Sequence, residues 1–317
     1  MLTEHRRPQR SGAPPLPGPG APWGGAVMGL SVTGSLLGVH VGITTGAAVT
    51  VVAGLVLLVL AVGAVRRPRF SDVPAWSMMT MGVLSLGSAA DTTLGWTGFH
   101  TVAWVLGTAA GVVVFTTQCA RFLRRKVAAD FTGVLPLVTL MVAATNAADL
   151  GHPGIGTACF SVSLVTAVPA FVRVYLAAGR RPAPGAAATA WIPLGVVGQS
   201  TAAALLLTDG STVGVTYAVV MLALGIPAAL WAMTNHWGGL VNVLTGHAPS
   251  PNPSWWAATF PVGTCCLGTH TLATATGLAW IDMTSAGLLA LLCIHVALAV
   301  TGTVSAVVAV VAQMHGR

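Results

Sequence analysis

The sequence has very little charge. Only 7% of its 317 residues are Asp, Glu, Lys or Arg, and lysine occurs once, at Lys126. A water-soluble domain carries about 25% charged residues, so this chain could not cover a surface in water. Because 55% of the residues are hydrophobic and the mean hydropathy is +0.82, the composition predicts an all-α integral membrane protein.

Charge is also missing from the middle of every predicted membrane span. Charged groups inside a membrane usually mark proton relays or cation sites. Their absence argues against a proton pump or a sodium-coupled carrier and favours an uncharged pore, although proton coupling through His270 or His295 stays open. No basic stretch is interleaved with aromatic residues, so a nucleic-acid partner is not expected.

The five cysteines and nine histidines lack the spacing of a metal or cofactor site. A haem-binding bundle needs histidines paired at one depth, whereas His270 should lie near an outer helix end and His295 deeper. We therefore predict no cofactor, no metal site and no enzymatic activity.

Ten stretches are long enough to cross the hydrocarbon core, which takes about 20 helical residues. Strongly apolar stretches alternate with weaker ones that are richer in Gly, Ser and Thr. The pattern predicts a ten-helix domain over residues 22–313, and the polar, then Pro- and Gly-rich segment 1–21 is predicted to be a disordered cytoplasmic tail. The strong spans are 44–65, 101–120, 156–178, 213–233 and 287–311, and the weak ones are 23–40, 74–90, 131–148, 191–207 and 255–272.

All 14 basic residues fall on one side of these spans. They precede the first span or lie at or beyond the ends of the second, fourth, sixth and tenth. The positive-inside rule makes that side cytoplasmic, with both termini inside, and predicts a multi-pass protein of the plasma membrane. The opposite side carries Asp91, Asp149, Asp209 and Asp282.

The basic residues also repeat. Arg-Arg pairs begin at positions 6, 66, 124 and 180, so they are 60, 58 and 56 residues apart. That period fits one helical hairpin with its loops, and the chain reads as five parallel hairpins. If the hairpins form a ring, the weak spans would surround a central pore and the strong spans would face lipid. The alternative is that the small residues of the weak spans only pack helices together.

Three weak spans carry distinctive motifs: SWWAATFP at 254–261, WIPLG at 191–195 followed by GQS at 198–200, and LP at 135–136 followed by MVAA at 141–144. With these motifs the sequence resembles the tellurite-resistance/dicarboxylate transporter family, which includes slow anion channels, fungal malate permeases and sulfite pumps. The resemblance implies ten helices as five hairpins around a central pore, often in a homotrimer. It also implies anion transport, with a phenylalanine of the ninth helix as a plug, here Phe260.

The candidate site residues follow from this picture. Phe260 is the predicted pore gate, and prolines within the weak spans could bend the pore wall. Hydroxyl and amide groups on the weak spans could replace water around an anion. Each has an alternative, because Ser and Thr often bond to their own helix and Gln199 could bridge two helices. The pore-lining or kink candidates are Thr33, Ser35, Ser77, Thr80, Ser85, Pro136, Thr139, Pro193, Gln199, Ser200, Thr259 and Pro261.

The predicted function is transport of a small anion of the C4-dicarboxylate (malate), sulfite or tellurite type, with that anion and membrane lipid as partners. One alternative is an exporter of a drug or metabolite with the same fold, which predicts a wider lumen without a plug. The other is a membrane protein that transports nothing, which predicts clustered polar catalytic groups or paired histidines.

Overall fold

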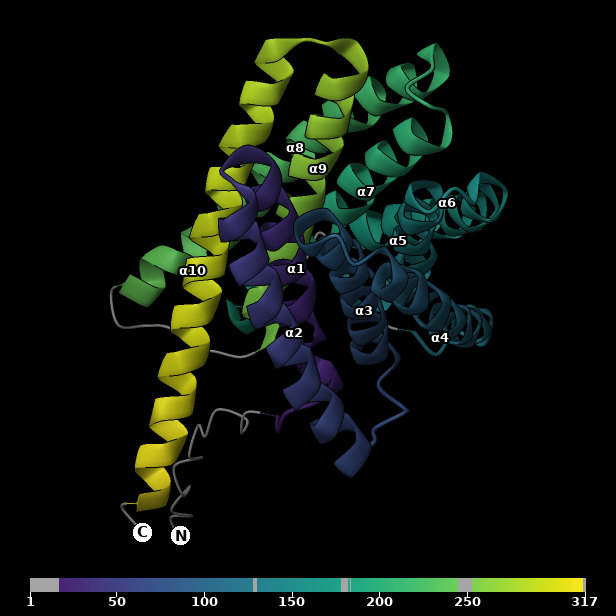
Figure 1. Ribbon diagram of the computed structural model, residues 1–317. Helices are drawn as coiled ribbons and strands as arrows, with labels where there is room; N and C mark the ends of the chain where they lie inside the picture. Colours follow the sequence, from purple (N-terminus) through teal and green to yellow (C-terminus); the bar gives the residue numbers. More distant parts are fainter. Residues whose placement is uncertain (1–16, 128–129, 178–181, 183, 245–252, 316–317) are drawn as a thin grey trace, which may run out of the picture.

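The computed structural model describes residues 17–127, 130–177, 182, 184–244 and 253–315 (Figure 1). Over these residues the chain forms ten α-helices, four short 3₁₀ segments and no strand, which confirms the predicted helical fold class. The helices are α1 (Gly24–His40), α2 (Ile43–Arg66), α3 (Val73–Leu94), α4 (Thr97–Leu123), α5 (Leu135–Asp149), α6 (Pro153–Ala177), α7 (Ile192–Leu207), α8 (Thr212–Leu244), α9 (Thr259–Thr276) and α10 (Ala279–His315).

Seven helical segments of the described chain are long and apolar enough to cross a membrane. They contain α2, α4, α5, α6, α7, α8 and α10, whereas α1, α3 and α9 are shorter or richer in Gly, Ser and Thr. Ten membrane crossings arranged as five hairpins therefore stay a prediction. Most of the predicted tail, residues 1–16, lies outside the described residues.

Five helices form a closed inner ring. Helix α1 packs against α3 and α9, and the circle is completed by contacts of α3 with α5, α5 with α7, and α7 with α9. We call α1, α3, α5, α7 and α9 the inner ring. In the spans of α5 and α7 about four fifths of the residues are buried, against 17–39% in α2, α4, α6, α8 and α10. The weakly apolar helices are thus the enclosed ones.

The even-numbered helices form an outer layer. Each packs against the inner helix before it and the next one along the ring, and α10 closes the circle on α1. Their outward faces expose large aliphatic side chains, a surface that suits lipid rather than water. Examples are Leu55, Leu58 and Val59 on α2, Val113 on α4, Val165 and Leu176 on α6, Leu224 on α8 and Val304 on α10.

Glycines bring the inner helices into close contact. A methyl group at Gly198 of α7 would overlap the backbone of Thr264 and Cys265 in α9. The same holds between α1 and α2, where a Cβ at Gly46 would lie 2.6 Å from the carbonyl oxygen of Gly34. Small residues allow such approach in membrane helices, and they explain why the enclosed spans read as weakly hydrophobic.

Two predicted kink sites instead mark helix starts. Short 3₁₀ segments, Thr132–Val134 and Pro184–Trp191, lead into α5 and α7. Pro136 and Pro193 occupy the first turn of these two helices, where the missing N–H leaves no hydrogen bond unmade. They therefore begin the inner helices and do not bend them midway.

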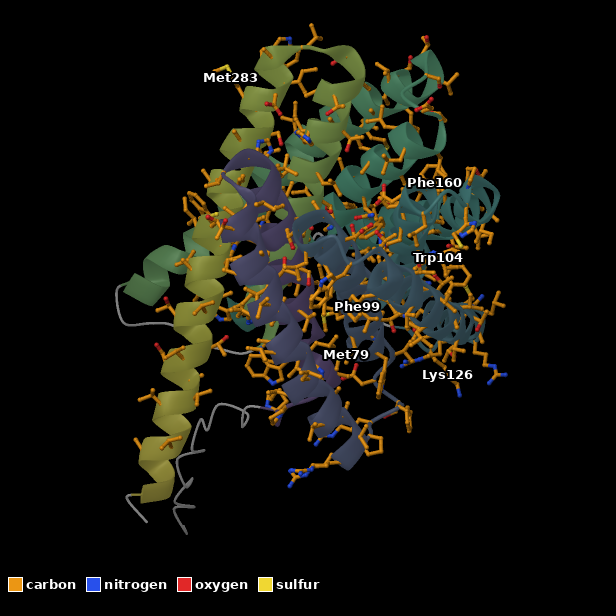
Figure 2. All side chains as sticks on the ribbon, viewed as in Figure 1. Met79, Phe99, Trp104, Lys126, Phe160 and Met283 are labelled. Atoms are coloured by element: carbon orange, nitrogen blue, oxygen red, sulfur yellow. The ribbon has the colours of Figure 1, made fainter. Side chains whose placement is uncertain are left out.

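The two ends of the bundle differ. One end, here the short-turn end, holds the tight connections of α1 to α2, α3 to α4, α5 to α6, α7 to α8 and α9 to α10. The other, here the arginine end, holds Arg66, Arg121 and Lys126, and Figure 2 shows Lys126 at the opposite end of the molecule from Met283 near the start of α10.

Candidate functional site

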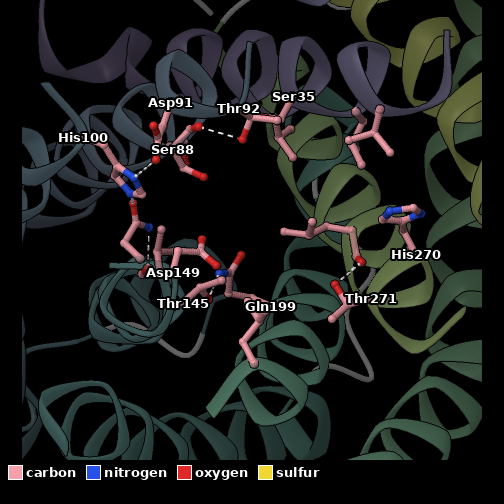
Figure 3. Close-up of a pocket in the computed structure, with 18 of the residues that line it drawn as sticks. Ser35, Ser88, Asp91, Thr92, His100, Thr145, Asp149, Gln199, His270 and Thr271 are labelled. Carbon is pink, nitrogen blue, oxygen red and sulfur yellow. Dashed lines mark hydrogen bonds and ion pairs between the residues drawn. The ribbon is translucent and has the colours of Figure 1, made fainter. Parts of the chain in front are cut away.

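A cavity of about 430 Å³ lies inside the inner ring (Figure 3). All five inner helices contribute to its wall, together with His100 of α4. We call it the central cavity. Its lining residues include Val32, Ser35 and Leu36 of α1, Ser85, Ser88, Asp91 and Thr92 of α3, Thr145, Asn146 and Asp149 of α5, Gln199 of α7, and Phe260, Leu267, His270 and Thr271 of α9.

A second, smaller cavity of about 30 Å³ continues the first toward the arginine end. Its wall is almost wholly apolar, and we call it the apolar cavity. Residues that line the two cavities follow each other by one helical turn, as Met28 and Val32 do on α1 and Met81 and Ser85 on α3. Since residues four apart share one face of a helix, the cavities are successive levels along the same axis.

Phe260 separates the two levels. Its ring is buried, and it is the residue common to the linings of both cavities. Pro261, the next residue, lines the apolar cavity. Both belong to the first turn of α9, which follows the 3₁₀ segment Pro253–Ala258.

A chain of polar contacts lies at the mouth of the central cavity. Nδ1 of His100 is 3.1 Å from Oδ2 of Asp91, and its Nε2 is 2.8 Å from Oδ1 of Asn146. The amide nitrogen of Asn146 donates to the Val142 carbonyl at 2.8 Å, so its oxygen faces His100 and Nε2 must carry a hydrogen. Nδ1 then faces a carboxyl oxygen, and a proton shared between Asp91 and His100 is needed to join them.

Deeper in the wall, Gln199 joins two inner helices. Its Nε2 donates to Oγ1 of Thr145, which links α7 to α5, while Thr145 donates to the Met141 carbonyl. By contrast, the hydroxyl groups of Ser35, Ser85 and Ser88 have no hydrogen-bond partner in the part of the chain that the structure describes. These three hydroxyls can donate to a molecule in the cavity.

The structure separates the predicted pore-lining residues into two groups. Gln199, Ser35 and Ser85 line the central cavity, and Gln199 also bridges α7 and α5. Thr139 does not line this cavity, and its buried Oγ1 has no hydrogen-bond partner among the described residues. The other hydroxyls donate to carbonyl oxygens of their own helical segment and are not among the lining residues. This second group contains Thr33, Ser77, Thr80, Ser200 and Thr259.

Several functional candidates escaped the sequence analysis. The expectation of an uncharged wall is wrong at the mouth, where Asp91 and Asp149 line the cavity. Their spacing of 58 residues marked them as equivalent positions in the repeat, and this could have shown that they share one wall. Nothing in the sequence marked His100 as a cavity residue, because it belongs to the outer helix α4 and reaches the cavity from outside the inner ring.

The expectation that no histidines are paired is also wrong. The rings of His236 and His295 lie 5.5 Å apart, and Trp191 donates to Nδ1 of His236 at 3.0 Å. His40 and His270 form a second pair with centroids 5.0 Å apart. His270 and His295 do fall in different clusters, as their positions in the sequence indicated.

Comparison with models of known protein families identifies the family of this chain. The family model described as voltage-dependent anion channel matches residues 20–304, nearly the whole described chain. Curated protein sequences give no significant match. The match confirms the resemblance to the tellurite-resistance/dicarboxylate transporter family. The chain therefore belongs to the voltage-dependent anion channel family of helical, multi-pass membrane proteins.

Proposed function

We propose that this protein moves a small anion across the membrane through the central cavity and past Phe260, which acts as the gate. The observation that carries the proposal is the position of Phe260 between two cavities on one axis. Membership of a family of anion channels and permeases supports it. So does the inner ring, which encloses that axis on all sides.

The wall of the central cavity suits an anion that is held weakly. Hydroxyl groups of Ser35, Ser85 and Ser88 offer hydrogen-bond donors where the anion would lose water. Neutral donors of this kind bind an ion well enough to admit it and weakly enough to release it. A protonated His100 would offset the negative charge of Asp91, because its Nδ1 lies 3.1 Å from Oδ2 of Asp91. The mouth would then repel an anion less than its two carboxyl groups suggest.

The substrate class that we propose is an oxyanion of the C4-dicarboxylate, sulfite or tellurite type. Such anions offer several acceptor oxygens to the hydroxyl groups of the wall, and they must displace the Phe260 ring to pass. An exporter of larger drugs or metabolites would need a wider opening than the Phe260 level provides. A protein without transport activity would leave the alignment of the two cavities unexplained, and we propose no enzymatic activity.

We further propose that the arginine end faces the cytoplasm in the plasma membrane, with both termini inside. The support is the basic charge gathered there, on Arg66, Arg67, Arg69, Arg121 and Lys126, since the positive-inside rule applies to short loops.

The broad apolar outer surface of the even-numbered helices would also accommodate neighbouring copies in a homotrimer.

The test is anion flux in proteoliposomes that contain the purified protein. Chloride, nitrate, sulfite and malate are compared, each with and without a pH gradient, and empty liposomes serve as the control. We expect protein-dependent flux of at least one of these anions. Flux that matches empty liposomes for all four would refute the proposal.

A further inference from the structure

Three residues that the proposed pathway does not require meet at the short-turn end. His40 ends α1, His270 lies in the last turns of α9, and Asp282 lies in the first turn of α10. One potential ligand atom from each lies within 4.8 Å of those of the other two. His270 also borders the central cavity, as Figure 3 shows.

The ring of His40 is held in one tautomer by its neighbours. Its Nε2 lies 3.1 Å from Oγ of the buried Ser285, and that hydroxyl donates its own hydrogen to the Cys266 carbonyl at 2.9 Å. Ser285 can therefore only accept from His40, so Nε2 carries a hydrogen and Nδ1 keeps a lone pair. Metal-binding histidines are commonly oriented in this way, by a hydrogen bond from the nitrogen that does not bind the metal.

His270 and Asp282 complete the donor set. Nδ1 of His270 is 3.0 Å from Oδ1 of Asp282, and the side chains are 29% and 52% exposed. Both are therefore within reach of ions in the surrounding water. The cluster combines two imidazoles with one carboxylate on three helices. Small rotations of the partly exposed His270 and Asp282 side chains would bring the three ligand atoms closer together.

We propose that His40, His270 and Asp282 bind a divalent transition-metal ion of the zinc class. Two histidines and one carboxylate are an established zinc donor set, and they leave one position of the tetrahedron for water or another ligand. Bonds of about 2.0–2.1 Å place tetrahedral ligand atoms about 3.4 Å apart. The ligand atoms of the cluster lie within 4.8 Å of one another, so they need to approach by up to about 1.4 Å. This site departs from the sequence prediction of no metal.

A bound ion would affect anion movement without lying in the pathway itself. It would tie the end of α1 to α9 and α10, and its positive charge would stand next to His270 at the wall of the central cavity. We therefore expect zinc to change the flux of a permeant anion, and we expect that change to disappear when the site is removed.

Binding is measured on the detergent-solubilised full chain by equilibrium dialysis against Zn²⁺. The expected result is one ion per chain, with affinity lowered at least 10-fold in each of the variants His40→Ala, His270→Ala and Asp282→Asn. His152→Ala is the matched control, because His152 is an exposed histidine at the same end that stacks on Trp104 away from the cluster. Cobalt is the spectroscopic probe, and its visible absorption reports tetrahedral coordination.

Absence of stoichiometric zinc binding by the wild-type chain would overturn the proposal. So would an equal loss of affinity in His152→Ala and His270→Ala. Asp282→Asn keeps the shape of the side chain, so a loss of zinc affinity in this variant cannot be attributed to the kind of folding defect that an alanine substitution could cause. Dialysis requires no transport, so the metal site and the proposed anion flux can fail independently.

Discussion

Asp91 and His100 are joined by a hydrogen bond at the mouth of the central cavity. Nδ1 and Oδ2 are 3.1 Å apart, and Asn146 fixes the other side of the ring at 2.8 Å. Thr97 also donates to Asp91, at 2.6 Å. With one proton between them, whichever side chain carries it, the pair has no net charge, and the entrance then repels an anion less than a lone carboxylate would.

Removal of the imidazole should therefore slow anion flux. In His100→Gln, Asp91 keeps a negative charge with no cationic partner. At about 6 Å from a passing anion this charge is worth roughly 0.7 kcal/mol in water and about 3 kcal/mol at an effective dielectric constant of 20, so flux should fall roughly 3- to 100-fold. The double variant Asp91→Asn, His100→Gln should recover it, and nitrate flux in proteoliposomes is the measurement. Equal flux in the single and double variants would contradict the charge argument.

Phe260→Ala should increase anion flux. The substitution removes the ring that separates the central cavity from the apolar cavity and joins the two into one passage. We expect conductance in planar bilayers to rise at least several-fold, whereas Phe260→Trp, which keeps a large ring, should stay near the wild-type level.

Phe99→Ala is the control for that experiment. Phe99 lies on α4 with 42% of its surface exposed on the outside of the bundle, so the same substitution there leaves the cavities intact. Unchanged conductance in a well-folded Phe260→Ala protein would count against a gate at this position.

Gly198→Ala should destabilise the protein. The added methyl group would overlap the backbone of Thr264 and Cys265, which cannot move without separating α7 from α9. Overpacking of this kind costs about 1–3 kcal/mol, and the loss is measured as a lower melting temperature in detergent. Gly54→Ala is the matched change, because a methyl group there meets open space, and a similar drop in both variants would show that the close approach is unimportant.

Hydropathy and charge were enough to predict the helical class and the order of the ten helices, but several helices extend beyond the predicted spans, as α8 and α10 do. The Gly, Ser and Thr residues scattered through α1 and α3 lower the hydropathy of these spans. Their presence reflects the enclosure of the two helices, since buried membrane helices need small residues for contact more than they need large aliphatic ones. The motif of residues 198–200 likewise has a packing role, because Gly198 sets the distance between α7 and α9.

The identity of the cavity-lining residues was harder to predict. The inner helices are buried on every side, so they have no polar stripe to show which face points inward. Thr33 and Ser35 are two residues apart on α1, yet Thr33 bonds to the Gly29 carbonyl and Ser35 faces the cavity. Which of two such residues faces the cavity depends on how the helix is rotated about its own axis, and contacts with neighbouring helices set that rotation. His100 and the cluster of His40 with His270 depend on contacts between segments far apart in the chain.

The inner ring has a mechanical consequence. A ring in which each helix touches the next, with α1 and α9 closing the circle, has no free edge along which two halves could rock apart. Widening the passage by moving whole helices would break contacts at two places at once. We therefore expect the width of the passage to change when a single aromatic side chain changes rotamer. Such a change is faster than the domain rearrangements by which alternating-access transporters open to one side of the membrane and then to the other.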